Sequence, residues 1–294
     1  MTTAITVVGD AVLDVHVVPA QPPRPGGDVP AEIRLEPGGQ GANVAVRLAR
    51  RRLPVRLVCA LGTDAAGSLL RERLGSEGVE VKGLSAPASG AVVVLLDATG
   101  ERTMLSQRVP FAALLGELLA GAGWLVVSGY LLLEPEAGIS GAGESPRRIL
   151  LGCSLGSAEV SGWLDAAADL RPHLAIVNAD EAGAISGFDA EPSALARRVA
   201  ERLEAIAVVT HPGGAAASLD GVSVEIAATS TEAAVDATGA GDAFSAGLIA
   251  DLAYEPWPPD ARRLEHAMAS AAELASAVAR VHGAQGRVAA EPPS

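Results

Sequence analysis

The stretch that decides the fold reads Val235-Asp236-Ala237-Thr238-Gly239-Ala240-Gly241-Asp242-Ala243-Phe244 and leads into small, helix-favouring residues at 245–252. Gly239, Ala240 and Gly241 let the backbone turn tightly and approach a ligand closely. Their N–H groups would lie at the start of that helix, where the helix dipole favours negative charge. Asp242 would repel a bare phosphate, but its carboxylate suits a base that takes the proton of an attacking hydroxyl. An N-capping aspartate at a glycine-rich helix start is the alternative interpretation.

Outward from this stretch, strand and helix patterns alternate along the chain. Strands are predicted at 5–8, 55–60, 91–97, 103–107, 124–128, 148–151, 175–177 and 207–210, and helices at 42–52, 64–78, 114–120, 193–203, 243–252 and 264–281. Such alternation with short links is typical of a doubly wound, mostly parallel α/β sheet flanked by helices. We interpret 77–82 as a helix end followed by a turn.

Two segments interrupt this alternation. The first, at about 15–36, contains a run rich in Pro and Gly, and the second, at about 89–107, contains two strand candidates around a turn. Together they predict a small β-strand lid on a single domain over residues 1–287. The Pro-rich segment 288–294 is predicted to be a loose tail.

Composition excludes several classes of protein. The 294 residues carry a net charge of -13, which is the wrong sign for a nucleic-acid-binding protein, although backbone amides and a metal can still hold a small anion. The N-terminus is not a signal peptide, and no apolar segment approaches the ~20 residues that a membrane helix needs. Cys59 and Cys153 lie in apolar stretches and are predicted to be buried free thiols. We expect a cytoplasmic protein that binds neither nucleic acid nor membrane.

Two common nucleotide-binding motifs are missing. Lys82 is the only lysine, so the chain has no Walker A lysine, and any ATP must be bound without a P-loop. The stretch Gly38-Gly39-Gln40-Gly41 lacks the third glycine of the dinucleotide-binding fingerprint and follows no obvious strand, which argues against a Rossmann site.

Three further groups of residues are candidates for ligand binding. Gly38, Gly39 and Gly41 would admit a polyol, and Asn43 has both donors and acceptors for its hydroxyls. Asp10 and Asp14 follow the first strand and could grip vicinal hydroxyls. Asn178 and Glu181 follow the strand at 175–177, at the carboxyl end where open α/β sheets bind ligands, and could order Mg²⁺ through water. Taken singly, each group could also be an ordinary turn or helix start.

The stretch 235–244 and the three further groups, taken in their order along the chain, resemble the PfkB-type (ribokinase-like) carbohydrate kinases. The resemblance covers about 7–285 of the chain. The segments 38–43 and 236–242 match the two sequence signatures of that family, and 178–181 matches its Asn-x-x-Glu motif. Weaker matches are Gly62-Thr63-Asp64 with Gly67, Gly100-Glu101-Arg102-Thr103, and Gly283-Ala284-Gln285.

The resemblance implies a ribokinase-like fold with a β lid and transfer of the ATP γ-phosphate to a sugar or nucleoside hydroxyl. It implies Asp242 as catalytic base, an anion hole from the amides of Gly239, Ala240 and Gly241, and an acceptor site formed by Asp10, Asp14, Gly38, Gly39, Gly41 and Asn43. Nucleotide and water-bound Mg²⁺ would be held by Asn178 and Glu181, with Thr210, Gly213, Thr238, Gly239 and Gly241 contributing to the nucleotide site. Lid-mediated homodimers occur in such kinases, so a homodimer through the lid is a further expectation.

The chain departs from the family pattern at several positions. Gln40 stands where ribokinases often have Lys, Gln107-Arg108-Val109-Pro110 replaces a Gly-Ala-Asn, and Pro212 replaces a Gly in the nucleotide segment 210–214. Gly286-Arg287 stands where ribokinases tend to have Pro-Ser, which argues against the monovalent-cation (K⁺) site known in part of the family.

The acceptor is left open between two classes of molecule. With 3% aromatic residues, the chain has few side chains to stack a nucleoside base, which favours a sugar kinase over an adenosine- or pseudouridine-type nucleoside kinase. A non-catalytic sugar or nucleotide sensor on the same scaffold is a third hypothesis, and the retained Asp242 argues against it.

Overall fold

A computed structural model of the protein describes residues 4–96, 102–109, 111, 113–114, 122–133, 139–140, 147–156, 158–229, 236, 238–254, 256–281, 283–289 and 291. Its main sheet has nine strands in the order β15-β14-β13-β12-β11-β9-β1-β4-β5. These strands are β1 (Ala4–Val8), β4 (Val55–Leu61), β5 (Glu80–Ser85), β9 (Ala122–Val127), β11 (Arg147–Leu151), β12 (Leu174–Asn178), β13 (Ile206–His211), β14 (Gly214–Leu219) and β15 (Val222–Ala227). All pair in parallel except the β13-β14-β15 meander at one edge, so the predicted doubly wound fold is confirmed.

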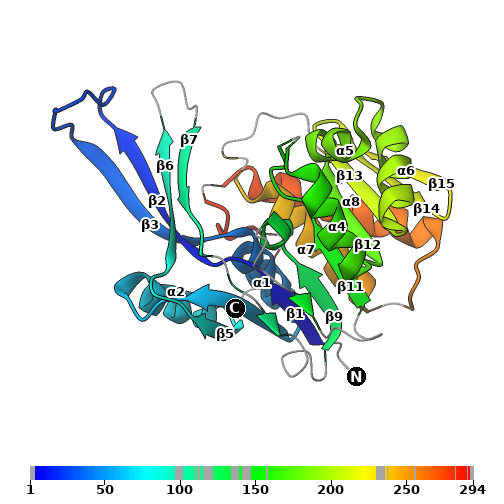
Figure 1. Ribbon diagram of the computed structural model, residues 1–294, viewed down its shortest axis with the longest axis horizontal. Coiled ribbons are helices and arrows are strands. Elements are labelled where there is room, and N and C mark those ends of the chain that lie inside the picture. Colours follow the sequence, from blue (N-terminus) through cyan, green and yellow to red (C-terminus); the bar gives the residue numbers. More distant parts are fainter. Residues whose placement is uncertain are drawn as a thin grey trace.

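Helices cover both faces of this sheet (Figure 1). They are α1 (Gln40–Arg50), α2 (Ala65–Ser76), α4 (Val160–Leu170), α5 (Ala179–Ser186), α6 (Pro192–Leu203), α7 (Ala240–Ala253) and α8 (Ala261–Val278), with a 3-10 turn η1 at Gly129–Leu133. Alternate residues of each buried strand face opposite layers: Val7 packs in the cluster with α1, α7 and α8, whereas Val8 packs in the cluster with α4, α5 and α6.

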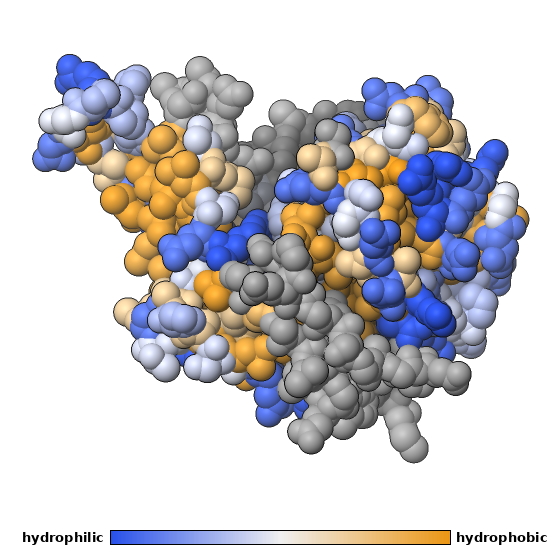
Figure 2. All heavy atoms as spheres, in the orientation of Figure 1, coloured by the Kyte–Doolittle hydropathy of each residue, from blue (hydrophilic) through white to orange (hydrophobic). Residues whose placement is uncertain are grey.

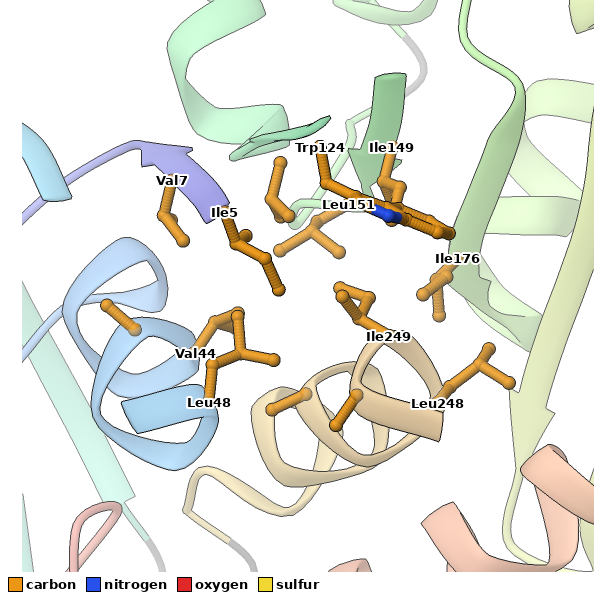
Figure 3. Close-up of a cluster of buried hydrophobic side chains, with 14 of the residues drawn as sticks. Ile5, Val7, Val44, Leu48, Trp124, Ile149, Leu151, Ile176, Leu248 and Ile249 are labelled. Atoms are coloured by element: carbon orange, nitrogen blue, oxygen red, sulfur yellow. The ribbon is translucent and has the colours of Figure 1, made fainter. Parts of the chain in front are cut away.

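The largest apolar cluster lies between the sheet and the helices α1 and α7. Figure 3 shows Ile5, Trp124 and Ile149 from the strands meeting Leu48 of α1 and Ile249 of α7. All of these side chains are buried. Tight packing here fixes α1 and α7 side by side, and these two helices carry the two glycine-rich motifs at their first turns.

A second sheet stands out from the α/β body, at the left of Figure 1. It has four strands in the order β3-β2-β6-β7, namely β2 (Val12–Pro19), β3 (Ala31–Gly38), β6 (Gly90–Leu96) and β7 (Arg102–Gln107). The prediction of a small additional β unit from these two segments is confirmed by this sheet. A short pair, β8 (Ala113–Leu114) with β10 (Ile139–Ser140), completes the strands found in the described part of the chain.

Several local predictions need correction. The segment 77–82 is only partly a turn, because helix α2 ends at Ser76 and Glu80 already begins strand β5, which pairs with β4 and is not recognisable from its charged sequence. Leu114 belongs to β8 instead of a helix, and 115–120 lies outside the described residues. The edge strands β14 and β15 are additional to the prediction.

The prediction of a loose tail over 288–294 is wrong at Glu291. This side chain is buried and forms ion pairs with Arg47 and Arg50 of helix α1. Residues 290 and 292–294 lie outside the described part of the chain. Cys59 and Cys153 are buried free thiols, as predicted. Among the described residues, no helix is long and apolar enough to cross a membrane.

Candidate active site

The predicted site residues follow the carboxyl ends of the central strands. From β1 the chain first builds β4 and β5 on one side and then β9 to β15 on the other, so the strand order reverses between β1 and β9. Ligands of open α/β sheets bind at such a switch point. Asp10 follows β1 there, beside Ser128, which follows β9. The first candidate acceptor residue, Asp10, therefore lies at the switch point.

The first glycine-rich motif brings helix α1 against the turn after β1. A Cβ on Gly39 would lie 2.7 Å from the carbonyl oxygen of Asp10, and a Cβ on Gly41 would lie 2.8 Å from the backbone of Gly9. Gly39 also has a φ of 96°, in the region that favours glycine. The amide of Ala42 donates to the Asp10 carbonyl at 3.0 Å. These glycines therefore have a structural role: they let α1 begin directly beside Asp10.

The two motifs meet through side chains. Asn43 Nδ2 donates to Asp242 Oδ2 at 2.8 Å, although the two residues are 199 positions apart. Gln285 Nε2 in turn donates to Asn43 Oδ1 at 3.0 Å, which fixes the orientation of the Asn43 amide. Burial raises the pKa of Asp242 to about 7, the hydrogen bond from Asn43 opposes the rise, and the charge of Asp10 adds to it. A carboxyl with that pKa exchanges a proton readily near neutral pH.

The start of α7 has a different requirement at each of its two glycines. Gly239 has a φ of 77°, and a Cβ there would lie 2.7 Å from Ala284, so packing and backbone conformation both demand glycine. Gly241 is exposed, and a Cβ there would meet nothing within 4 Å. Among the described residues, no contact explains glycine at 241. These residues thus leave the space over the first amides of α7 free for a ligand.

Asp236 holds the loop before α7. Its Oδ1 accepts a hydrogen bond from the amide of Thr238 at 2.9 Å, and its Oδ2 accepts one from the amide of Gly283 at 3.0 Å. Thr238, predicted as a nucleotide contact, therefore sits in a turn that is tied to the segment following α8. The alternative interpretation of Asp242 as an N-cap is wrong, because the cap residue is Gly239 and Asp242 lies in the first turn of α7.

Acidic residues gather around the predicted acceptor side. A Cβ on Gly38 would lie 2.1 Å from the Asp14 carboxylate, so glycine at 38 makes room for that side chain. Burial raises the pKa of Asp14 to about 7, and the charges of Asp10 and Glu36 raise it further. Arg108 opposes this rise and forms an ion pair with Asp10. The Arg108 guanidinium also lies 3.7 Å from the centre of the Tyr130 ring.

The predicted nucleotide residues lie further along the same edge. Asn178 and Thr210 are partners in the register of β12 and β13, at their carboxyl ends, and Gly213 lies in the turn from β13 to β14. These three residues are therefore placed together but on the far side of the switch point from Asp10.

Asn178 and Glu181 form a reciprocal capping box. Asn178 Oδ1 accepts from the Glu181 amide at 2.8 Å, and Glu181 Oε2 accepts from the Asn178 amide at 2.9 Å. The motif is thus a helix start, which is its alternative interpretation. No hydrogen bond to Glu181 Oε1 is found among the described residues. Burial raises the pKa of Glu181 to about 7, with the charge of Asp180 adding to it. No positively charged side chain pairs with this carboxylate among the described residues, so it fits a cation held nearby.

Three residues that contact the site are additional to the predicted set, namely Gln40, Arg108 and Gln285. Gln40 donates to the Gly152 carbonyl at 2.8 Å and accepts from Ser128 Oγ at 2.6 Å, which ties α1 to the ends of β9 and β11. Arg108 and Gln285 reach Asp10 and Asn43 from distant parts of the chain. In the sequence, only the departures from the family pattern at positions 40 and 107–110 point to Gln40 and Arg108.

Comparison with known proteins agrees with this geometry. The model of the pfkB family carbohydrate kinases matches residues 2–290. The chain belongs to that family. It is a carbohydrate kinase, and the fructokinase of Klebsiella pneumoniae is 32% identical to it over 305 residues, covering 97% of this chain and 95% of that protein.

Solved structures show the same fold at lower identity. The Arabidopsis thaliana ribokinase complexed with ribose and ATP has a TM-score of 0.77 at 22% identity, covering 99% of this kinase and 96% of that chain. The adenosine kinase of Sinorhizobium meliloti also has a TM-score of 0.77, at 18% identity, with 99% and 98% covered. The prediction of a ribokinase-like fold is confirmed.

Proposed function

We propose that this kinase transfers the γ-phosphate of ATP to a hydroxyl of a small, uncharged sugar, with Asp242 as the general base. One observation carries the proposal: Asp242, with a pKa raised to about 7, is held by Asn43 at 2.8 Å beside the open first turn of α7. Amides at a helix start stabilise a phosphoryl group, while the neighbouring carboxylate accepts the proton of the attacking hydroxyl.

The charges on the acceptor side favour an uncharged acceptor. The carboxylates of Asp10, Asp14, Glu36 and Asp242 influence one another, and Arg108 already forms an ion pair with Asp10. A sugar acid or sugar phosphate would add another negative charge to this group and be repelled. Sugar hydroxyls instead donate hydrogen bonds to carboxylates, and Asn43 can both donate and accept.

The aromatic residues favour a sugar over a nucleoside. Trp124 is fully buried in the core, and one face of Tyr130 is covered by the Arg108 guanidinium. Trp124 is therefore not free to stack on a base, and Tyr130 is not free to do so on the covered face. Because the full-length relative from Klebsiella pneumoniae is a fructokinase, fructose is the first acceptor to test.

ATP would lie along the carboxyl ends of β12 and β13, with its γ-phosphate toward α7. Thr210 and Gly213 would contact the nucleotide, and the amides of Gly239, Ala240 and Gly241 would stabilise the transferred group. Glu181 would hold water-bound Mg²⁺ near Asn178, and the metal would neutralise the charge of the phosphates.

The four-stranded sheet is proposed as both lid and dimer interface. Cross-strand register places Val15, Leu35, Val93 and Leu105 in one row on the same face. The charged residues Asp14, Glu32, Arg34 and Glu36 alternate onto the opposite face, where Asp14 and Glu36 reach the site.

The apolar face is exposed to a degree that is unusual for a monomer. Leu35 is 56% exposed and Leu105 is 63% exposed, and Figure 2 shows hydrophobic side chains gathered over this sheet. A second copy of the chain would cover such a face in an isologous, two-fold contact that has no buried charge.

A coupled assay of ADP formation tests the proposed reaction. We expect turnover with fructose or another uncharged sugar, and weaker or no turnover with ribose 5-phosphate, gluconate or adenosine. Asp242→Asn should lower kcat by about 10²-fold or more, because proton acceptance is lost, while ATP binding measured by calorimetry is retained. Asp251→Asn, which removes a half-buried acid that pairs with Arg51 near the other end of α7, is the matched control and should keep wild-type turnover.

Near-wild-type turnover in Asp242→Asn would remove the base assignment. Equal ATP hydrolysis with and without every acceptor would argue against transfer to a sugar, and binding of ATP and sugar without any ADP formation would favour the sensor hypothesis.

A further inference from the structure

Glu291 joins two buried arginines of helix α1. Its Oε1 lies 2.7 Å from Arg47 Nη1, and its Oε2 lies 3.2 Å from Arg50 Nη1. The side chains of Glu291 and Arg47 are 2% and 0% exposed, and that of Arg50 is 5% exposed. Charges so far from water persist only where they are paired, so the three side chains depend on one another.

Each arginine also holds the backbone of the segment that follows α8. Arg47 Nη2 donates to the carbonyl of Ala284 at 2.7 Å, and Arg50 Nη1 donates to the carbonyl of Gln285 at 2.9 Å. The Nε and Nη2 groups of Arg50 bind Glu77 at 2.9 Å. With Glu291 in place, both guanidinium groups are therefore aimed at two successive carbonyls.

Those two residues contact the site directly. Ala284 packs on Gly239, where even one added Cβ would come within 2.7 Å, so the position of Ala284 sets the position of the first residue of the anion hole. The Gln285 side chain donates to Asn43 Oδ1, and Asn43 donates to Asp242 Oδ2. Glu291 is thus connected, by contacts that the described residues make, to both the amides and the base of the site.

Stability alone does not account for this arrangement. An ion pair that merely fixed the C-terminal segment to α1 would need only the carboxylate and one arginine. Here each arginine donates both to Glu291 and to a carbonyl next to the site, and the charge of Arg47 lowers the pKa of Asp242. The family match ends at residue 290, one residue before Glu291.

We propose that Glu291 is a positioning residue for phosphoryl transfer: through Arg47 and Arg50 it fixes Ala284 and Gln285, and hence Gly239, Asn43 and Asp242. The inference rests on the proposed kinase reaction. It assigns to the C-terminal segment a part in catalysis and not in fold stability alone.

The test is Glu291→Gln, which keeps the size of the side chain and removes its charge. Misplacement of reacting groups by a fraction of an ångström lowers the rate steeply, so kcat should fall by about tenfold or more. The Kd for ATP should change less than kcat, because only the start of α7 is reached through Ala284, whereas Asn178, Thr210 and Gly213 make no contact with the 284–285 segment in any interaction found among the described residues. Hydrogen exchange should increase in peptides covering 239–243 and 283–286 while the strands β11–β13 keep wild-type protection.

Glu77→Gln is the matched control. It removes a carboxylate from Arg50 of the same network, leaves the contacts of Arg47 intact, and should keep kcat within about twofold. Gln285→Met removes only the amide that orients Asn43, so it should reproduce the kcat loss even where Glu291→Gln fails to fold.

Two results would overturn the inference. The first is kcat within twofold of wild type in folded Glu291→Gln, or in Gln285→Met. The second is equal loss of kcat in Glu77→Gln and Glu291→Gln. Failure of the proposed reaction is seen separately, as absence of turnover in the wild-type protein. In that case the hydrogen-exchange comparison at 239–243 still shows whether Glu291 fixes the start of α7, whereas its part in catalysis falls with the reaction.

Discussion

Replacing Asp242 by Asn should make the protein more stable above neutral pH although it strongly lowers kcat. Burial raises the pKa of Asp242 from 3.8 to about 7. The folded protein thus holds this proton more tightly than the unfolded chain does. The group contributes stability that is fully present below about pH 4 and is lost as pH rises through about 7. Asparagine avoids that loss and keeps an oxygen that can accept from Asn43.

The size of the effect follows from the shift. At about 1.4 kcal/mol for each tenfold change in the protonation equilibrium, the rise from 3.8 to about 7 sets an upper limit of about 4 kcal/mol. Asp242 is only partly buried, so about half of this, about 2 kcal/mol, is the expected gain at pH 8. For a domain of this size the melting temperature should rise by about 5 °C.

Urea unfolding of wild type and Asp242→Asn at pH 5 and pH 8 measures the difference. The advantage of the variant should grow by about 1 to 2 kcal/mol between these pH values. Glu181, whose pKa burial also raises to about 7, is present in both proteins and cancels. The charge of Asp242 raises the pKa of Asp14 further, so its removal lowers that pKa and adds to the advantage of the variant at pH 8. Asp251→Asn should show no such growth. An advantage that is equal at both pH values, or smaller at pH 8, would refute the desolvation of Asp242.

Two more predictions concern the acceptor and the second sheet. Asn43→Ala should raise the acceptor KM by about tenfold or more, because it removes one hydrogen bond to a charged group and the contact that orients Asp242. The Kd for ATP should change less. Titrations in which ATP binding weakens more than acceptor binding would contradict the site map. Leu105→Asp should convert the proposed dimer to a monomer in light scattering, because it would bury a charge in the apolar face. Ser106→Asp, on the opposite face, should leave the dimer intact, and a wild-type monomer would rule the interface out.

Much of the fold follows from local patterns. Apolar runs such as Ala175-Ile176-Val177 predict buried parallel strands, and the strands at β1, β9, β11, β12 and β13 lie where the sequence places them. Strand β5 carries charge at Glu80 and Lys82 because it is the exposed edge of the sheet, so its apolar pattern is weak. Strands β14 and β15 form a hairpin at the other edge, and their small residues give little propensity signal.

The sequence by itself determined which residues can carry the chemistry. Gly239, Gly241 and Asp242 share one short stretch, so the turn, the helix start and the carboxylate follow from neighbours along the chain. In the same way, the two glycine-rich motifs and the alternation of strands and helices are sufficient to identify the family and its fold.

Only the tertiary structure decided which distant residues meet. Arg108 on Asp10, Gln285 on Asn43 and Glu291 on Arg47 join positions that are 98, 242 and 244 apart in the chain. Local propensity reaches a few residues, whereas these contacts depend on how the sheet stacks α1 beside α7 and returns the C-terminal segment beneath them. The same packing removes water from Asp242, and that loss of solvation raises its pKa.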